Sequence, residues 1–407
     1  MVLNSSGGIF RSGIIRLNRK FQFQFGSSIP HIDVAYQMVG KENAPIIFIA
    51  PSMSHSFNVT RSLTERLAKT GVKGWWEKTV GWGDEFGVDL NNYQILSASP
   101  LGSPHSTTSP ACINPATNRE YRLDFPLLTP HDQARCHTNL MEELGIKFPL
   151  HAMIGSSMGG MAVIEAMIQK PDISQLAVVI ATTGQTSPST QALRSVQRDA
   201  VRMDPNFQNG NYAANARPDA GMKIARKIGT IAYRSRQEFD ARFQSRPNIK
   251  KNNNNSNNNP PSQSQMSSSG NLSFPVDNYL EHQSASFGSR YDACCYLRLS
   301  ECMDLQDISR PFNNDYETAC KQISQSSEWL MIPVTEDALI PAHELDRFAA
   351  TLGKLGVKVQ LARLSSPHGH DAFLTQSSAI NWQIRSFLSG GVDGVRQSSN
   401  EYNGQSI

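Results

Sequence analysis

The stretch HAMIGSSMGGMAVIEAM, residues 151–167, is the feature that most constrains the fold. It contains the pattern Gly-x-Ser-x-Gly, with Ser157 at its centre. An apolar run at 150–154 favours a buried strand before the pattern, and the residues from Met158 onward favour a helix after it. A sharp turn between a strand and a helix places its central serine in a strained, exposed position. We therefore predict that Ser157 is a nucleophile at a helix N-terminus, where free N–H groups favour negative charge.

Short β-rich runs alternate with helical patterns in both halves of the chain. This alternation predicts a mostly parallel sheet with helices on both faces. Between residues 184 and 327 only helical patterns are found, which predicts an all-helical lid inserted before the last strands. The β-rich runs are residues 44–52, 92–99, 148–156, 176–183, 328–341 and 357–366.

These patterns also set the expected domain boundaries. We expect the sheet core to comprise residues 21–183 and 328–390, and the helical lid to comprise residues 184–327. Within the lid, the Asn- and Ser-rich residues 250–270 lack the apolar side chains that a packed core needs, so we predict a disordered surface loop there. Residues 391–407 are expected to form a flexible C-terminal tail.

Residues 1–20 form a basic segment, and the first acidic residue of the chain is Asp33. This composition suits a frayed N-terminus or an organellar presequence. The six cysteines show no metal-type spacing, and the adjacent Cys294 and Cys295 would make an awkward disulfide. We therefore expect reduced thiols, no metal site and a cytoplasmic location, with a mitochondrial location as the alternative.

Composition argues against two classes of partner. The net charge of +3 gives no electrostatic basis for binding nucleic acid or a membrane surface. No apolar run approaches the roughly 20 residues that a membrane-spanning helix needs. The 407 residues, 39% hydrophobic and 18% charged, are typical of a soluble globular chain with a large core.

A nucleophilic serine needs a base, and the base needs an acid that orients it. In alpha/beta-hydrolases the acid and then the histidine follow the serine in the chain. Asp337 follows a late β-rich run, with Glu336 as a competing acid, and could instead cap the next helix. His370 follows the last run, with His368 as a competing base. Because open α/β sheets place their sites at the carboxyl ends of strands, we predict a triad of Ser157, Asp337 and His370.

The chain resembles the homoserine/serine O-acyltransferase family, alpha/beta-hydrolase-fold enzymes that acylate an amino-acid hydroxyl from an acyl-CoA. The resemblance covers about residues 21–390, apart from the Asn-rich loop. The blocks that carry it are GWWEKTVGWG (74–83), LGSPHSTTSPACINPATNREYRLDFPLLT (101–129), GSSMGGM, VQRDAVRMDPNF, GMKIARKIGTIAYRS, EDALIP and HGHDAFL.

The resemblance implies an alpha/beta-hydrolase fold and assigns roles to individual residues. Ser157 matches the nucleophile, Asp337 the acid and His370 the base. The backbone N–H groups of Met53 and Met158 match the oxyanion hole, where the side chain matters little because the donor is the backbone.

Three further residues match substrate-binding positions of the family. Arg198 matches an arginine suited to a substrate carboxylate, and Asp371 an acid suited to a substrate ammonium group. Tyr233 lies in a matching lid segment. The alternatives are that Arg198 is a surface charge on a lid helix and that Asp371 caps a local turn.

The activity implied is ping-pong acyl transfer from acetyl-CoA or succinyl-CoA to L-serine or L-homoserine, in cysteine or methionine biosynthesis. No bound cofactor is expected, and the resemblance implies a homodimer. The lid segment 233–243 favours the serine-acylating branch, whereas residues 50–57 and 99–110 depart from the family pattern. Donor and acceptor therefore stay open. The alternative function is a serine esterase that uses the same triad, and a non-catalytic relative would normally have lost one triad member.

Overall fold

The computed structural model describes residues 2–3, 8–243, 245 and 274–404. The Asn- and Ser-rich segment 250–270, predicted to be a disordered loop, lies outside the described residues.

A nine-stranded sheet forms the centre of the molecule, and neighbouring strands from β9 to β15 run parallel. Antiparallel strands extend the sheet at the edge formed by the N-terminal part of the chain. The mostly parallel sheet predicted from the alternating patterns is thus confirmed. In spatial order the strands are β1 (Val2–Leu3), β2 (Gly8–Leu17), β5 (Ile32–Lys41), β9 (Gln94–Ala98), β6 (Ile46–Ala50), β12 (Leu150–Ser156), β13 (Ser174–Ile180), β14 (Glu328–Ile332) and β15 (Lys358–Leu361).

Three short two-stranded sheets lie outside the central one. They are β3 (Phe21–Gln22) with β4 (Ser28–Ile29), β7 (Val80–Gly81) with β8 (Val88–Asp89), and β10 (Ile113–Asn114) with β11 (Arg119–Glu120).

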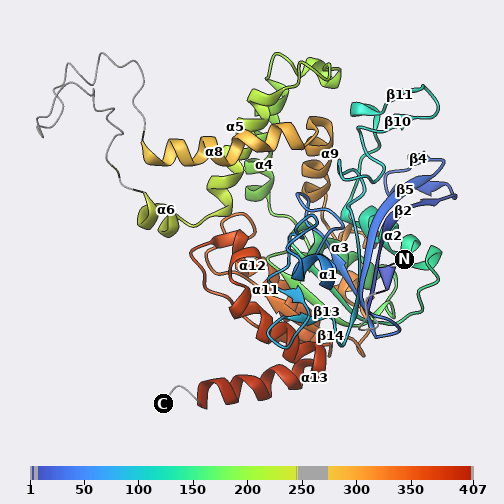
Figure 1. The fold of residues 1–407 in the computed structure, drawn as a ribbon, viewed down its shortest axis with the longest axis vertical. Helices are drawn as coiled ribbons and strands as arrows, with labels where there is room; N and C mark the ends of the chain where they lie inside the picture. The colour runs from blue at the N-terminus through green and yellow to red at the C-terminus, as the bar shows by residue number, and fades with distance from the viewer. Residues whose placement is uncertain (1, 4–7, 244, 246–273, 405–407) are drawn as a thin grey trace, which may run out of the picture.

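Successive residues of the central strands enter two separate hydrophobic cores. Met153 packs in one core and Ile154 in the other, as the alternation of side chains along a strand requires. The first core includes residues of α2 (Pro130–Glu143), α3 (Met158–Gln169) and α11 (Ala342–Lys354). The second includes residues of α13 (Ser377–Gly404), so helices cover both faces of the sheet (Figure 1).

The N-terminal boundary of the core differs from the prediction. Residues 8–17 form β2, which pairs with β5 along its whole length and buries Leu17. The Arg16 guanidinium lies 2.7 Å from a carboxylate oxygen of Asp33 on β5. The sheet therefore begins before residue 21. Basic residues are compatible with this strand because much of it is exposed to solvent.

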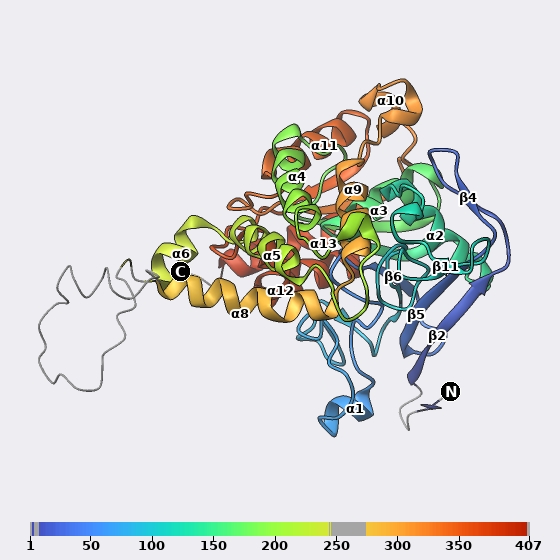
Figure 2. The ribbon, with the colours of Figure 1, turned by 90° about the horizontal axis from the view of Figure 1, so that it is seen from above.

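Helices over the sheet make up most of the region predicted to be a lid. Figure 1 shows α4, α5, α8 and α9 gathered on one side of the molecule, and Figure 2 shows α5 and α8 side by side. The α-helices that the structure describes in this region are α4 (Pro188–Arg202), α5 (Asp219–Tyr233), α6 (Arg236–Arg242), α8 (Pro275–Arg290), α9 (Ala293–Asp304) and α10 (Tyr316–Cys320).

The C-terminal residues also differ from the prediction. The helical assignment of α13 continues to Gly404 across a kink at Gly390 and Gly391, where Gly391 has a φ of 60°. Beyond the kink, Val392 and Val395 are buried. The predicted tail therefore begins too early, because the residues just beyond the kink are helical and pack against the second hydrophobic core. None of the helices in the described part of the chain has the length and hydropathy of a membrane-spanning segment.

Candidate active site

Ser157 lies in the turn between β12 and α3, with φ 53° and ψ −124°. A non-glycine residue at positive φ is strained, and such strain concentrates at functional sites. A Cβ at Gly155 would lie 2.3 Å from the carbonyl oxygen of Gly159, and a Cβ at Gly159 would lie 2.1 Å from that of Ala50 on β6. The backbone is thus packed too closely for any side chain at either glycine. This close packing is the reason for the Gly-x-Ser-x-Gly pattern.

Ser157, His370 and Asp337 form one chain of hydrogen bonds. The Oγ of Ser157 lies 2.9 Å from Nε2 of His370, and Nδ1 of His370 lies 2.6 Å from Oδ2 of Asp337. The other oxygen of Asp337 accepts hydrogen bonds from the N–H groups of Leu339 and Ile340, at 2.8 and 2.9 Å. The three residues are only 4–6% exposed. The structure therefore brings together the three residues predicted from the order of the chain.

The competing acid and base have other partners. Glu336 accepts hydrogen bonds from the Ser365 hydroxyl at 2.6 Å and from the Ser366 N–H at 2.7 Å. His368 lies 2.8 Å from the guanidinium of Arg234. His370 is accordingly the histidine that contacts Ser157, and Asp337 is the carboxylate that contacts His370.

The environment of His370 suits a general base. Burial alone disfavours the charged imidazolium, but the charge of Asp337 and its hydrogen bond outweigh this effect, so the pKa of His370 is raised above its usual 6.5. A raised pKa makes the imidazole a stronger base for the proton of the serine hydroxyl.

The two predicted oxyanion-hole residues lie at the first turn of α3 and in the wall of the cavity that contains Ser157. Met158 is the first residue of α3, where a backbone N–H has no intrahelical acceptor. Met53 follows β6 and lines the same cavity as Ser157. Its carbonyl accepts a 2.7 Å hydrogen bond from the Tyr291 hydroxyl, which fixes this part of the loop to the lid region.

Two lid arginines that the sequence analysis missed line the cavity above Ser157. Arg194 on α4 is 2% exposed and donates through Nη1 to Asp304 at 2.8 Å. Its Nε and Nη2 are buried and have no hydrogen-bond partner among the described residues, and the same holds for Nε of Arg226 on α5. Buried donors without partners are costly, so these groups are suited to bind an anionic ligand.

Asp371 and Tyr233 also line this cavity, in agreement with their predicted placement. Burial raises the pKa of Asp371, against the opposing charge of Arg234, whose Nε lies 3.3 Å from its carboxylate. The ring of Tyr233 lies 5.8 Å from that of His370, and the Arg226 guanidinium lies 5.5 Å from the Tyr233 ring centre. The cavity thus combines cationic groups, a carboxylate and the serine. Among the described residues, no group of three His, Cys, Asp or Glu side chains could hold a metal ion.

Comparison with known proteins identifies the family. A family model described as "alpha/beta hydrolase fold" matches residues 68–376. Homoserine O-acetyltransferase of Methanobrevibacter ruminantium is 32% identical over 92% of this chain and 73% of that protein. Serine O-succinyltransferase of Xylella fastidiosa is 32% identical over 91% of this chain and 96% of that protein. The chain belongs to the homoserine/serine O-acyltransferase family of the alpha/beta-hydrolase fold.

Solved structures agree with this family in their fold. The crystal structure of homoserine O-acetyltransferase from Bacillus anthracis has a TM-score of 0.81 at 23% identity, covering 94% of this chain and 99% of that one. The crystal structure of esterase E22 has a TM-score of 0.80 at 22% identity, and the match covers 93% of this chain and 100% of the esterase chain. Transferases and esterases therefore share this architecture, and the chemistry depends on the cavity.

One predicted substrate-binding residue does not line the cavity, and its role stays a prediction. Arg198, expected to bind a substrate carboxylate, is not among the cavity-lining residues. Its Nη1 instead donates to Asp304 at 2.5 Å and to the Ser300 hydroxyl at 3.0 Å. Arg194 precedes it by one helical turn on the same face of α4 and reaches the cavity. The i, i+4 spacing of the two arginines is the sequence signal that could have placed both near the site.

Proposed function

We propose that this protein transfers an acyl group from an acyl-CoA to the side-chain hydroxyl of L-serine or L-homoserine through an acyl-Ser157 intermediate. The observation that carries the proposal is the hydrogen-bonded chain Ser157–His370–Asp337 at a cavity that Arg226 and Asp371 also line. Family membership supports O-acyltransferase activity in amino-acid biosynthesis.

In the first half-reaction, His370 takes the proton of the Ser157 hydroxyl while Oγ attacks the thioester carbonyl carbon. The backbone N–H groups of Met53 and Met158 stabilise the oxyanion, and removal of one such donor typically costs about 3–4 kcal/mol. The C–S bond then breaks, and CoA leaves as a thiol with the proton from His370. In the second half-reaction, His370 takes the proton of the acceptor hydroxyl while its oxygen attacks the carbonyl carbon of the acyl-enzyme. The bond between that carbon and Oγ of Ser157 then breaks, and His370 returns the proton to Oγ.

Charge complementarity supports an amino acid as the acceptor. An amino acid carries a carboxylate and an ammonium group, and each needs an opposite charge in a site with little water. The Arg226 guanidinium would bind the carboxylate and Asp371 the ammonium group. The lid helices that close over the cavity would keep water from hydrolysing the acyl-enzyme.

The second guanidinium suggests which acyl group is transferred. Arg194 has two buried donors without partners, beside the arginine that would bind the acceptor. A dicarboxylic acyl group such as succinyl carries a terminal carboxylate that would accept from both donors, whereas an acetyl group would leave them unpaired. We therefore propose succinyl-CoA as the preferred co-substrate, without any bound cofactor.

The experiment that tests this function measures release of the CoA thiol by the purified protein. Acetyl-CoA and succinyl-CoA are each offered with L-serine, with L-homoserine and without an acceptor, beside a Ser157→Ala control. We expect release that requires succinyl-CoA and one amino acid and disappears in the control. Equal release without an acceptor would instead identify a hydrolase, in line with the esterase alternative, and dependence on acetyl-CoA would overturn the donor assignment alone.

Exposed apolar side chains on the lid support a homodimer. Val196 and Met203 share one face of α4 and its C-terminus, and Ile224 and Ile231 share one face of α5; all four are 51–82% exposed. Two helices that pack against each other thus leave apolar side chains in solvent, which marks an interaction surface. We expect sedimentation to give a dimer for the native chain and a monomer for Ile231→Glu. A native monomer at assay concentrations would contradict this expectation.

A further inference from the structure

The segment Gly74–Trp75–Trp76–Glu77 has no role in the proposed chemistry, yet it contacts two parts of the active site. Neither tryptophan is among the residues that line the cavity. Their contacts run instead to the loop after β6, which carries Met53, and to the segment after β15, which carries His370.

Trp75 holds the loop after β6. Its indole stacks on the ring of His55 with centres 4.4 Å apart, and its Nε1–H donates to the Ser56 carbonyl at 3.0 Å. His55 lines the cavity and lies 2.8 Å from the Ser52 hydroxyl through Nδ1. Trp75 thereby fixes the residues on either side of the Met53 N–H.

Trp76 holds the segment that contains the base. Its Nε1–H donates to the Phe373 carbonyl at 2.9 Å, three residues after His370, in a fully buried contact. Phe373 also lines the cavity, and its ring lies edge-on to those of both His55 and His370, 6.2 Å from each. The two indoles stack on each other with centres 5.2 Å apart, so they form one rigid unit.

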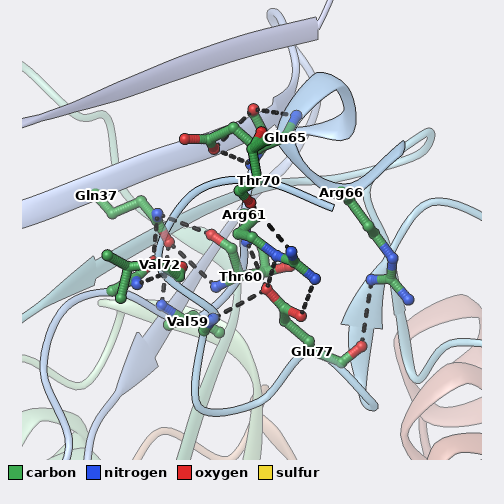
Figure 3. Close-up of polar contacts among 12 residues, drawn as sticks. Gln37, Val59, Thr60, Arg61, Glu65, Arg66, Thr70, Val72 and Glu77 are labelled. Atoms are coloured by element: carbon green, nitrogen blue, oxygen red, sulfur yellow. Dashed lines mark hydrogen bonds and ion pairs between the residues drawn. The ribbon is translucent and has the colours of Figure 1, made fainter. Parts of the chain in front are cut away.

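A partly buried ion pair between Glu77 and Arg61 joins the residue after Trp76 to the segment that precedes α1 (Figure 3). Glu77 accepts from the backbone N–H of Gly74 at 2.9 Å and from Nε and Nη2 of Arg61 at 2.8 and 2.9 Å. Although burial opposes ionisation, these contacts lower the pKa of Glu77 below its usual value. The side-chain amide of Gln37 on β5 donates a hydrogen bond to the Thr60 carbonyl and accepts one from the Thr60 N–H.

Close backbone packing leaves this anchor little freedom. A Cβ at Gly74 would lie 2.2 Å from the Val59 carbonyl oxygen. The backbone N–H of Trp75 donates to the Asn58 carbonyl at 3.2 Å, and the backbone N–H of Trp76 donates to the Val59 carbonyl at 3.0 Å. By contrast, the nearby helix α1 (Leu63–Leu67) projects from the body of the molecule and has no buried residues (Figure 2). The rigidity therefore lies in residues 74–77 and the loop that they contact.

We propose that Trp75 and Trp76 are positioning residues that set the distance between the Met53 N–H and His370. One indole fixes the oxyanion side of the reacting carbonyl, the other fixes the base, and their stacking joins the two. Acyl transfer needs both groups in place at once, and a displacement of about 1 Å can cost roughly 10²-fold in rate. The inference rests on the proposed roles of Ser157, His370 and Met53.

The test compares Trp76→Phe with Trp329→Phe. Trp329 is a fully buried indole on β14 that donates to the Ser327 hydroxyl at 3.1 Å, and it does not line the cavity. Both variants lose one buried N–H donor and keep an aromatic ring. The readout is the acylation rate of Ser157 by a 4-nitrophenyl ester, together with the affinity for a boronic acid that mimics the tetrahedral intermediate.

We expect Trp76→Phe to lower the acylation rate and the boronic-acid affinity by the same factor, about 10-fold, with an unchanged KM for the ester. Trp329→Phe should leave all three unchanged even if both proteins melt earlier. Because the ester needs no acceptor, failure of amino-acid transfer would leave this test intact. Equal loss of acylation rate in the two variants, or a loss in KM alone, would overturn the proposal.

A second variant tests whether the two indoles act as one unit. Trp75→Phe removes the donor to Ser56, and Trp75 is only half-buried, so this variant places less demand on folding. If both residues hold a single distance, the double variant should be no slower than the slower single variant. Losses that multiply would mean that the two residues act independently, contrary to the proposal.

Discussion

An Asp337→Asn variant is expected to lose about 10⁴ in kcat for acyl transfer while remaining folded. Asp337 accepts two backbone N–H groups through one oxygen and contacts His370 through the other. In the variant, the amide oxygen would keep the backbone bonds, so the amide NH₂ would face Nδ1 of His370. Nδ1 would then have to accept a hydrogen bond, and the ring proton would move to Nε2, which could no longer take the proton of Ser157.

The matched control for this variant is Glu336→Gln, one residue earlier. Glu336 bonds to Ser365 and Ser366 and makes no contact with His370 among the described hydrogen bonds. We expect single-turnover acylation to be near normal in the control and lost in Asp337→Asn. A similar loss of acylation in both variants would mean that the activity depends on the conformation of this loop and not on the Asp337 carboxylate.

The pH profile adds a second readout. Asp337 holds the pKa of His370 above 6.5, and the base works only when it is neutral. In the native protein kcat/KM should therefore fall as the pH falls through this raised pKa. In Asp337→Asn the burial of the ring dominates, so the acid limb of the residual activity should move to lower pH. An acid limb at the same pH in both proteins would show that Asp337 does not control the base.

The triad could be predicted because its placement follows from rules that act locally or through the sheet. The turn at Ser157 is specified by neighbouring glycines, whose Cβ atoms would clash with the backbone. Asp337 and His370 each follow a parallel strand, and parallel strands end at a common edge. Residues more than 200 positions apart therefore meet without any detailed knowledge of side-chain packing.

Features that depend on how separate elements dock could not be predicted in the same way. The position of α4 along its axis decides whether Arg194 or Arg198 reaches the cavity, because the helical pattern shows only that the two residues share a face. The contact of Trp76 with Phe373 joins segments 297 residues apart. The kink at Gly391 follows from packing against the sheet, since the Val392 N–H donates to Glu328 on β14.

The last prediction concerns the two arginines of the cavity. Arg226→Gln is expected to lower kcat/KM for the amino-acid acceptor by about 10²-fold, and to leave the acylation rate by the acyl-CoA within about 2-fold. A hydrogen bond to a charged group contributes about 1.5–3 kcal/mol, and the acceptor carboxylate would lose such a partner. Steady-state kinetics with the acceptor varied at saturating donor, together with single-turnover acylation, measures the two effects separately.

Arg194→Gln should instead impair the acylation step and leave the acceptor step nearly unchanged. The acylation rate by succinyl-CoA should fall by about 10²-fold. Acylation by acetyl-CoA should be unchanged or faster, because the variant no longer buries the two guanidinium donors that lack partners. Arg202→Gln is the control, since Arg202 on the same helix forms an exposed ion pair with Glu301. If Arg194→Gln impaired the acceptor step and Arg226→Gln impaired acylation, the two roles would be exchanged. If both donors lost activity equally in Arg194→Gln, Arg194 would maintain the shape of the cavity without recognising the acyl group.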